Sequence, residues 1–165
     1  MYILLLDALA IIVLLAASVT DIKENRIPNK LIFPAMIAAC IMTGVFFRNT
    51  PIETVHRILG VFVLFISGAF LRYIIGLGDI KAIMLIVLCS GLTRTLYAFL
   101  FALILLLVYA VVTEKDHGRT HMRNIFMLFH GLTPQIEAGK KYPLAPFLLI
   151  GYIVSLAMTL KGIIP

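Results

Sequence analysis

Six apolar blocks, separated by short polar stretches, make up most of the chain. They cover residues 3–19, 31–47, 58–75, 80–92, 96–112 and 144–160. Most are about 17 residues long, close to the shortest helix that crosses the hydrocarbon core of a bilayer, and a helix can extend beyond its apolar block. We therefore predict an all-α, polytopic membrane protein with about six transmembrane helices in a single domain over residues 1–165. The fourth block, with about 13 residues, is the shortest span.

Basic residues between the blocks predict the orientation. With the N-terminus outside, only Arg48, Arg57, Arg94 and Lys161 lie on the outer side. The inner gaps then hold the other ten basic residues: Lys23, Arg26, Lys30, Arg72, Lys81, Lys115, Arg119, Arg123, Lys140 and Lys141. Because loops rich in Lys and Arg stay in the cytoplasm, this distribution predicts a cell-membrane protein with both termini outside.

Composition narrows the function classes. The chain is 62% hydrophobic and only 13% charged, whereas a soluble domain has about a quarter charged residues. Its net charge of +6 is carried in short gaps without interleaved aromatic residues, so we expect lipid bilayer and no nucleic acid as a partner. Cys40 and Cys89 each lie alone in an apolar block, which favours neither a zinc ribbon nor a disulfide framework.

Three acids lie in or at the edge of these blocks: Asp7, Asp21 and Asp79. A charged carboxylate near the bilayer centre costs about 2.5–3.5 kcal/mol, so each needs a reason. Asp7 precedes Asp21 by fourteen residues, or about 21 Å of helix, which predicts an interfacial acid near the outer face. Asp21 and Asp79 both fall at cytoplasmic block ends. Two carboxyl groups that meet there can share a proton and act as acid and base on a water molecule.

Structural explanations exist for both of these acids. Asp79 is a suitable N-cap for a helix beginning at Ile80, and Asp21 can mark the point where the first helix reaches water. An N-cap does not require the preceding Gly76 and Gly78. Glycines let the backbone leave helical geometry and let another chain approach closely, as a peptide substrate must.

Three stretches together resemble the type IV prepilin peptidases, a branch of the GxGD intramembrane aspartic proteases. "GLGDIK" (residues 76–81) resembles the family's GxGDxK motif. "TDIKENRIPN" (residues 20–29) is similar to its upstream Asp followed by Ile-Pro-Asn, and "YPLAPFLLIG" (residues 142–151) to the proline-containing entry into its last span. The three occur in the family's order and cover a chain that is nearly all peptidase core.

The resemblance implies an aspartic endopeptidase that removes the leader from prepilin or pseudopilin precursors at the cytoplasmic face. It implies Asp21 and Asp79 as the catalytic pair, with no metal or cofactor because the carboxylates themselves polarise the water. The other motif residues, expected in motif structure or substrate access, are Gly76, Gly78, Lys81, Ile27, Pro28 and Asn29.

Two further features bear on the predicted activity: the lack of a CxxC motif and the long inner gap. Many members carry a cytoplasmic region with paired CxxC motifs together with N-methylation activity. This sequence has no CxxC, so it resembles the short, peptidase-only members, and methylation is not expected. The long inner gap, residues 113–142, contains "MRNIFMLFHGL", which is interpreted either as a packed connector or as an amphipathic helix on the membrane surface or over the active-site mouth.

Two other function classes remain open at this stage. A proton- or cation-coupled transporter could use the same acid pair as a relay, and it requires a polar path that continues across the bilayer. A non-enzymatic pilus-assembly component could keep the fold and bind a pilin leader without cutting it. The scattered polar residues in the spans, Thr43, Ser67 and Ser90, disfavour a relay, and the intact motif residues disfavour a non-enzymatic protein.

Overall fold

The computed structural model describes residues 2–46, 51–71, 76–113 and 143–163. These residues contain no strand and form six helices: α1 (Tyr2–Glu24), α2 (Asn29–Phe46), α3 (Pro51–Leu71), α4 (Leu77–Ser90), α5 (Leu92–Thr113) and α7 (Ala145–Leu160). Each predicted block corresponds to a helix, so the all-α prediction is confirmed. The predicted connector or surface helix at residues 113–142 lies, from residue 114 on, outside the described residues.

The outer surface of the bundle is suited to lipid. Within the described part of the chain, four helical stretches are long and apolar enough to cross a membrane: Leu4–Glu24, Asn29–Phe46, Pro51–Gly68 and Leu92–Ala110. Large apolar side chains such as Ile12, Phe65 and Leu107 are more than half exposed, which a water-soluble surface rarely shows over whole helices. The chain is therefore a multi-pass membrane protein.

Helix α4 is the short central helix of the bundle. It packs against α1, α2, α3 and α5, and it is buried at Ile80 and at every position from Ala82 to Ser90. A helix that is apolar on all sides is one that is covered on all sides. At about 21 Å it is too short to cross a hydrocarbon core of about 30 Å alone. This central position explains why the fourth apolar block is the shortest.

The end of α4 is fixed by partners from neighbouring helices. Arg57 of α3 donates through Nη1 to the carbonyl oxygens of Leu88 (2.9 Å) and Cys89 (2.6 Å), and Thr43 of α2 donates to Leu88 (3.2 Å). These bonds satisfy carbonyls that a helix C-terminus leaves unpaired. Gly91 then takes a positive φ of 86°, and α5 begins at Leu92. The prediction that Leu92 ends the fourth span was therefore wrong, because one glycine suffices for the turn.

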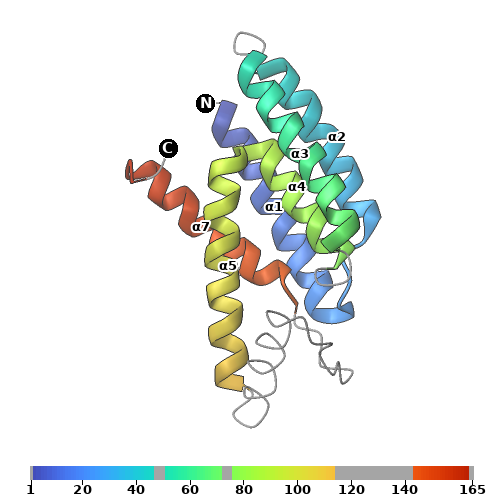
Figure 1. The fold of residues 1–165 in the computed structure, drawn as a ribbon, viewed down its shortest axis with the longest axis vertical. Coiled ribbons are helices and arrows are strands. Elements are labelled where there is room, and N and C mark those ends of the chain that lie inside the picture. The colour runs from blue at the N-terminus through green and yellow to red at the C-terminus, as the bar shows by residue number, and fades with distance from the viewer. Residues whose placement is uncertain (1, 47–50, 72–75, 114–142, 164–165) are drawn as a thin grey trace.

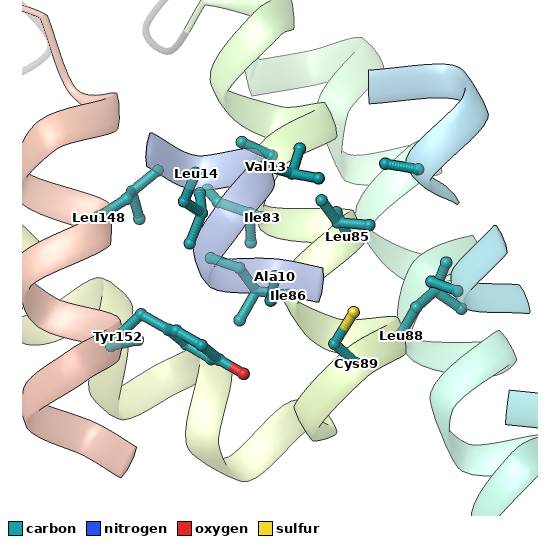
Figure 2. Packing of buried hydrophobic residues seen from close by; sticks show 14 of the residues in the cluster. Ala10, Val13, Leu14, Ile83, Leu85, Ile86, Leu88, Cys89, Leu148 and Tyr152 are labelled. Atoms are coloured by element: carbon teal, nitrogen blue, oxygen red, sulfur yellow. The ribbon is translucent and has the colours of Figure 1, made fainter. Parts of the chain in front are cut away.

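Helices α1 and α7 extend the core on the other side of α4. Figure 1 shows α7 crossing α5, with α1 beside it, and α7 packs against both. Figure 2 shows Leu14 of α1 and Leu148 of α7 in the same cluster as Ile83 and Ile86 of α4. Helix α1 continues to Glu24, five residues beyond the predicted block, so Asp21 lies within its last turn. We call the end of the bundle where α1 ends and α4 and α7 begin the Asp21 end, and the opposite end the Asp7 end.

The α5–α7 crossing depends on three small residues. A Cβ atom on Gly151 would lie 2.2 Å from the carbonyl oxygen of Ala98 and 3.0 Å from the amide nitrogen of Ala102. Ala98 and Ala102, one turn apart on α5, are both fully buried. Small residues at such a crossing let two membrane helices approach closely.

We predict that Gly151→Ala destabilises the bundle. The new methyl group would collide with backbone atoms that cannot rotate away, and overpacking of this kind costs about 1–3 kcal/mol. The melting temperature of the detergent-solubilised protein should fall by several degrees. Gly44→Ala is the matched control, since nothing lies within 4 Å of a Cβ there, and its melting temperature should be unchanged or slightly higher. Equal melting temperatures for the two variants would contradict the proposed packing.

Candidate active site

Asp21 is buried in the last turn of α1. Its side chain is only 6% exposed. The helix ends because Asn25 adopts a left-handed conformation (φ 49°) and donates its N–H to the backbone carbonyl oxygen of Asp21 at 2.9 Å. Asparagine tolerates this conformation better than most residues, so it is a common residue just after a helix. The chain then turns sharply, and Ile27 is placed beside the start of α4.

The carboxylate of Asp21 is held by the start of α7. Its Oδ2 accepts a hydrogen bond from the backbone N–H of Ala145 at 3.0 Å, and Ala145 is the first residue of that helix. The first N–H groups of a helix have no partner within the helix and carry the positive end of its dipole. They therefore favour an ionised carboxylate. Pro146, at the second helical position, fits there because proline has no N–H to satisfy.

Asp79 lies in the first turn of α4, ahead of the apolar run of that helix and outside the four candidate spans. The helix begins at Leu77 with Gly76 as its N-cap, and no side chain makes a capping bond. The alternative interpretation of Asp79 as an N-cap before Ile80 was therefore wrong. The pKa of the Asp79 carboxyl is raised to about 6, mainly by burial and to a smaller extent by the negative charge of Asp21. The Asp79 carboxyl thus lies within the electric field of Asp21 at the Asp21 end.

Both motif glycines make room for neighbouring groups. A Cβ on Gly76 would lie 3.0 Å from Oδ2 of Asp79, and a Cβ on Gly78 would lie 3.1 Å from Cβ of Ile27. Either contact is tighter than nearly all real Cβ contacts. Gly76 therefore leaves space for the Asp79 carboxyl group, and Gly78 lets the loop after α1 approach the backbone of α4.

The remaining motif residues tie that loop to α4. Lys81 donates from Nζ to Oδ1 of Asn29 at 2.6 Å, and its ammonium group lies 5.1 Å from the centre of the Phe33 ring. Pro28 precedes α2, and its carbonyl oxygen accepts from the N–H groups of Leu31 and Ile32. The two motifs that were distant in sequence are thus neighbours, and the loop between α1 and α2 supports the helix that carries Asp79.

Asp7, predicted as an interfacial acid near the outer face, is buried inside the bundle. It is 2% exposed, accepts a hydrogen bond from the hydroxyl of Tyr152 on α7 at 2.6 Å, and pairs with Arg94 of α5 at 3.3 Å. Figure 2 shows the Tyr152 ring pointing from α7 into the core. In the sequence, the opposite charge of Arg94 at the same predicted depth as Asp7 is the signal that indicates this pair, in addition to its use as a topology signal. The hydrogen bond from the Ala145 N–H to Asp21 is not predicted by the sequence, because a backbone donor has no signature there.

Comparison with known families decides what kind of protein carries this site. A family model described as the type IV leader peptidase family matches residues 8–111. The chain belongs to the type IV leader peptidase family. It is accordingly a membrane-embedded peptidase of the leader-peptidase type. No curated protein and no solved structure matches the chain. The matched range of this leader peptidase includes Asp21 and Asp79, whereas Ala145 and Tyr152 follow it.

The raised pKa of Asp79 predicts a pH-dependent effect on stability. The folded state binds this proton more tightly than the unfolded state, so the favourable contribution is complete below the ordinary pKa of 3.8 and is lost as the pH rises through about 6. Asp79→Asn removes the ionisation. The variant should therefore melt a few degrees above wild type at pH 8 and close to wild type at pH 4, measured by thermal unfolding in detergent. Glu24→Gln, an exposed change at the same end, should show no such difference. A shift of equal size at both pH values would contradict the assignment.

Proposed function

We propose that this leader peptidase is an aspartic endopeptidase that cleaves the leader from prepilin or pseudopilin precursors at the cytoplasmic face of the cell membrane. What supports the proposal is that Asp21 and Asp79 lie at the same end of two helices that pack together, α1 and α4, where the charge of Asp21 acts on Asp79. The surroundings of the two carboxyl groups differ, and this difference suits one of them to act as the base and the other as the acid. Pairs of acids whose environments separate their protonation states are the usual arrangement for acid–base chemistry.

Asp21 is suited to act as the base. It is buried and accepts a hydrogen bond from the N–H at the start of α7, which favours the ionised carboxylate. Asp79 is suited to act as the acid, because its pKa is raised to about 6 and the carboxyl is largely protonated only below that pH. Acid–base catalysis is most effective when the catalytic pKa lies near the working pH. Two acids in this state carry a single negative charge, as an apolar site requires.

In the proposed reaction a water molecule bound between the two acids attacks the carbonyl carbon of the scissile peptide bond. Asp21 accepts a proton from this water, and Asp79 donates its proton to the carbonyl oxygen, which gives a neutral tetrahedral diol. When the carbon–nitrogen bond breaks, Asp21 gives its proton to the leaving amine. A hydroxyl of the diol returns its proton to Asp79 as the new carboxylic acid forms. Both acids end in the state in which they began.

The exposed side of the site lies at the start of α4. Gly76 and Leu77 are exposed, and Asp79 is partly exposed, so an extended substrate segment can reach the acid from this side. Lys23, Arg26 and Lys30 are exposed at the same end. Basic residues at a helix-bundle end favour the cytoplasmic side. This distribution supports a cytoplasmic active site.

A proton relay is disfavoured by what lies between the acids at the two ends. The buried positions of α1 from Asp7 to Asp21 are mostly apolar: Ala10, Val13, Leu14 and Ala17. Ser18 is buried but donates its hydroxyl to the carbonyl oxygen of Leu14 within the same helix. Asp7 itself is bound by Tyr152 and Arg94. A transporter would need polar groups along this stretch, and hydrolysis at one end does not.

We predict that Asp21→Asn and Asp79→Asn each abolish cleavage of a coexpressed prepilin. Each change removes either the base or the acid, so the rate should fall at least roughly 100-fold. Cleavage can be measured as the conversion of precursor to mature pilin on a gel. Glu24→Gln is the matched control, since Glu24 is an exposed acid one turn after Asp21, and it should cleave at the wild-type rate.

Membrane levels of the four proteins should be compared in the same experiment. Both Asp→Asn variants should be present at wild-type amounts, because each keeps the shape of the side chain. Cleavage at more than about a tenth of the wild-type rate by either variant would exclude a mechanism that needs both acids.

A further inference from the structure

A second polar cluster, formed by Asp7, Tyr152 and Arg94, lies in the bundle at the Asp7 end. The Tyr152 hydroxyl donates to Oδ1 of Asp7 at 2.6 Å, and Nη1 of Arg94 lies 3.4 Å from Oδ1 and 3.3 Å from Oδ2. Asp7 is 2% and Tyr152 0% exposed, and the Arg94 side chain is 15% exposed. Asp7 is about 21 Å along α1 from Asp21, so the cluster takes no direct part in the proposed chemistry.

The cluster and the active site are joined by the same two helices. Helix α7 is bound to α1 at two points, through the Ala145 N–H on Asp21 and the Tyr152 hydroxyl on Asp7. Ala145 and Tyr152 are two turns apart on α7, about 10 Å along its axis. The partners of these residues on α1, Asp7 and Asp21, are about 21 Å apart along the axis. The length of the tyrosine side chain covers much of the remaining distance. These two bonds therefore set the position of α7 along α1.

Hydrogen bonds between helices contribute to this position together with close packing. Membrane helices have no hydrophobic force that draws them together in lipid, so close packing and hydrogen bonds determine their register. Gly151 fixes how near α7 comes to α5. A shift of α7 by even 1 Å along α1 would lengthen the 3.0 Å bond from Ala145 to Asp21 beyond good hydrogen-bond geometry.

We propose that Asp7, Tyr152 and Arg94 are positioning residues for catalysis, which hold α7 along α1 so that the Ala145 N–H stays on the Asp21 carboxylate. The inference rests on the proposed function, because it gives this N–H the role of holding the Asp21 carboxylate in place as the base. Tyr152 makes the connection between the helices, and Arg94 balances the buried charge of Asp7.

Tyr152→Phe tests the proposal because it removes only the hydroxyl group. The kcat for prepilin cleavage should fall about tenfold, the effect of losing one buried hydrogen bond to a charged group, while KM stays within about twofold. Hydrogen–deuterium exchange resolved to single residues should show faster exchange at the Ala145 amide, which is protected by Asp21 in the wild type. This second measurement needs no substrate.

Ser155→Ala is the matched control. Ser155 is fully buried on the same helix, but its hydroxyl donates to the carbonyl oxygen of Tyr152 within α7 at 2.8 Å and does not connect two helices. Its kcat and the exchange of the Ala145 amide should equal those of wild type. Asp7→Asn, which keeps an acceptor for the Tyr152 hydroxyl, should retain kcat within about threefold. Asp7→Leu removes the acceptor and also leaves Arg94 without its ion-pair partner, so its kcat should fall at least as far as that of Tyr152→Phe.

The outcomes separate this inference from the proposed function. A wild-type kcat in Tyr152→Phe, a rise in KM alone, or unchanged exchange at Ala145 would overturn the positioning role. Equal losses in Tyr152→Phe and Ser155→Ala would also overturn it, since they would reflect general loosening of α7. Absence of prepilin cleavage by the wild-type protein would instead refute the proposed function, and the exchange measurement would still decide whether Tyr152 fixes the start of α7.

Discussion

A carboxyl group inside an apolar helical bundle must either have partners for its charge or hold a proton. The three acids of the described core satisfy this constraint in three ways. Asp7 is neutralised by Arg94 and bonded by Tyr152. Asp21 accepts the N–H at the start of α7. Asp79 has no capping bond, lies within the field of Asp21, and has a pKa raised to about 6. Only the last two lie at the same end of the bundle in unlike surroundings, and that difference is what the proposed acid–base chemistry requires.

The short central helix is what brings this pair together. Since α4 is only 14 residues long and is surrounded by other helices, its first turn lies beside the end of α1 rather than beyond it. Gly76 and Gly78 remove the side chains that would keep Asp79 and Ile27 apart from the backbone. Lys81 and Asn29 then fasten the loop to the helix. Packing and support of the loop therefore explain why the motif contains these glycines and this lysine. The proposed chemistry explains why it contains the acids.

Much of this arrangement is predictable from sequence, because charges and glycines are rare in apolar blocks. The helices follow from the block lengths and are found, and the charge of Asp21 acts on Asp79 at the end that the motifs indicate. Predictions failed where contacts with other helices determine the length of a helix, the position of a turn or the burial of a side chain. A helix that continues to Glu24, a turn made by Gly91 alone, and the burial of Asp7 all depend on neighbours that a local pattern does not specify. The Ala145 N–H is a backbone group, which any residue except proline would supply.

The central claim is that the charge of Asp21 acts on the protonation of Asp79, and an infrared pH titration of the purified protein tests it most directly. The carboxylic-acid band that is absent from Asp79→Asn reports Asp79. In the wild type this band should disappear with a midpoint near pH 6, and in Asp21→Asn the midpoint should move to lower pH, because one of the two causes of the raised pKa has been removed. A midpoint that Asp21→Asn leaves unchanged would show that the two acids do not act as a pair.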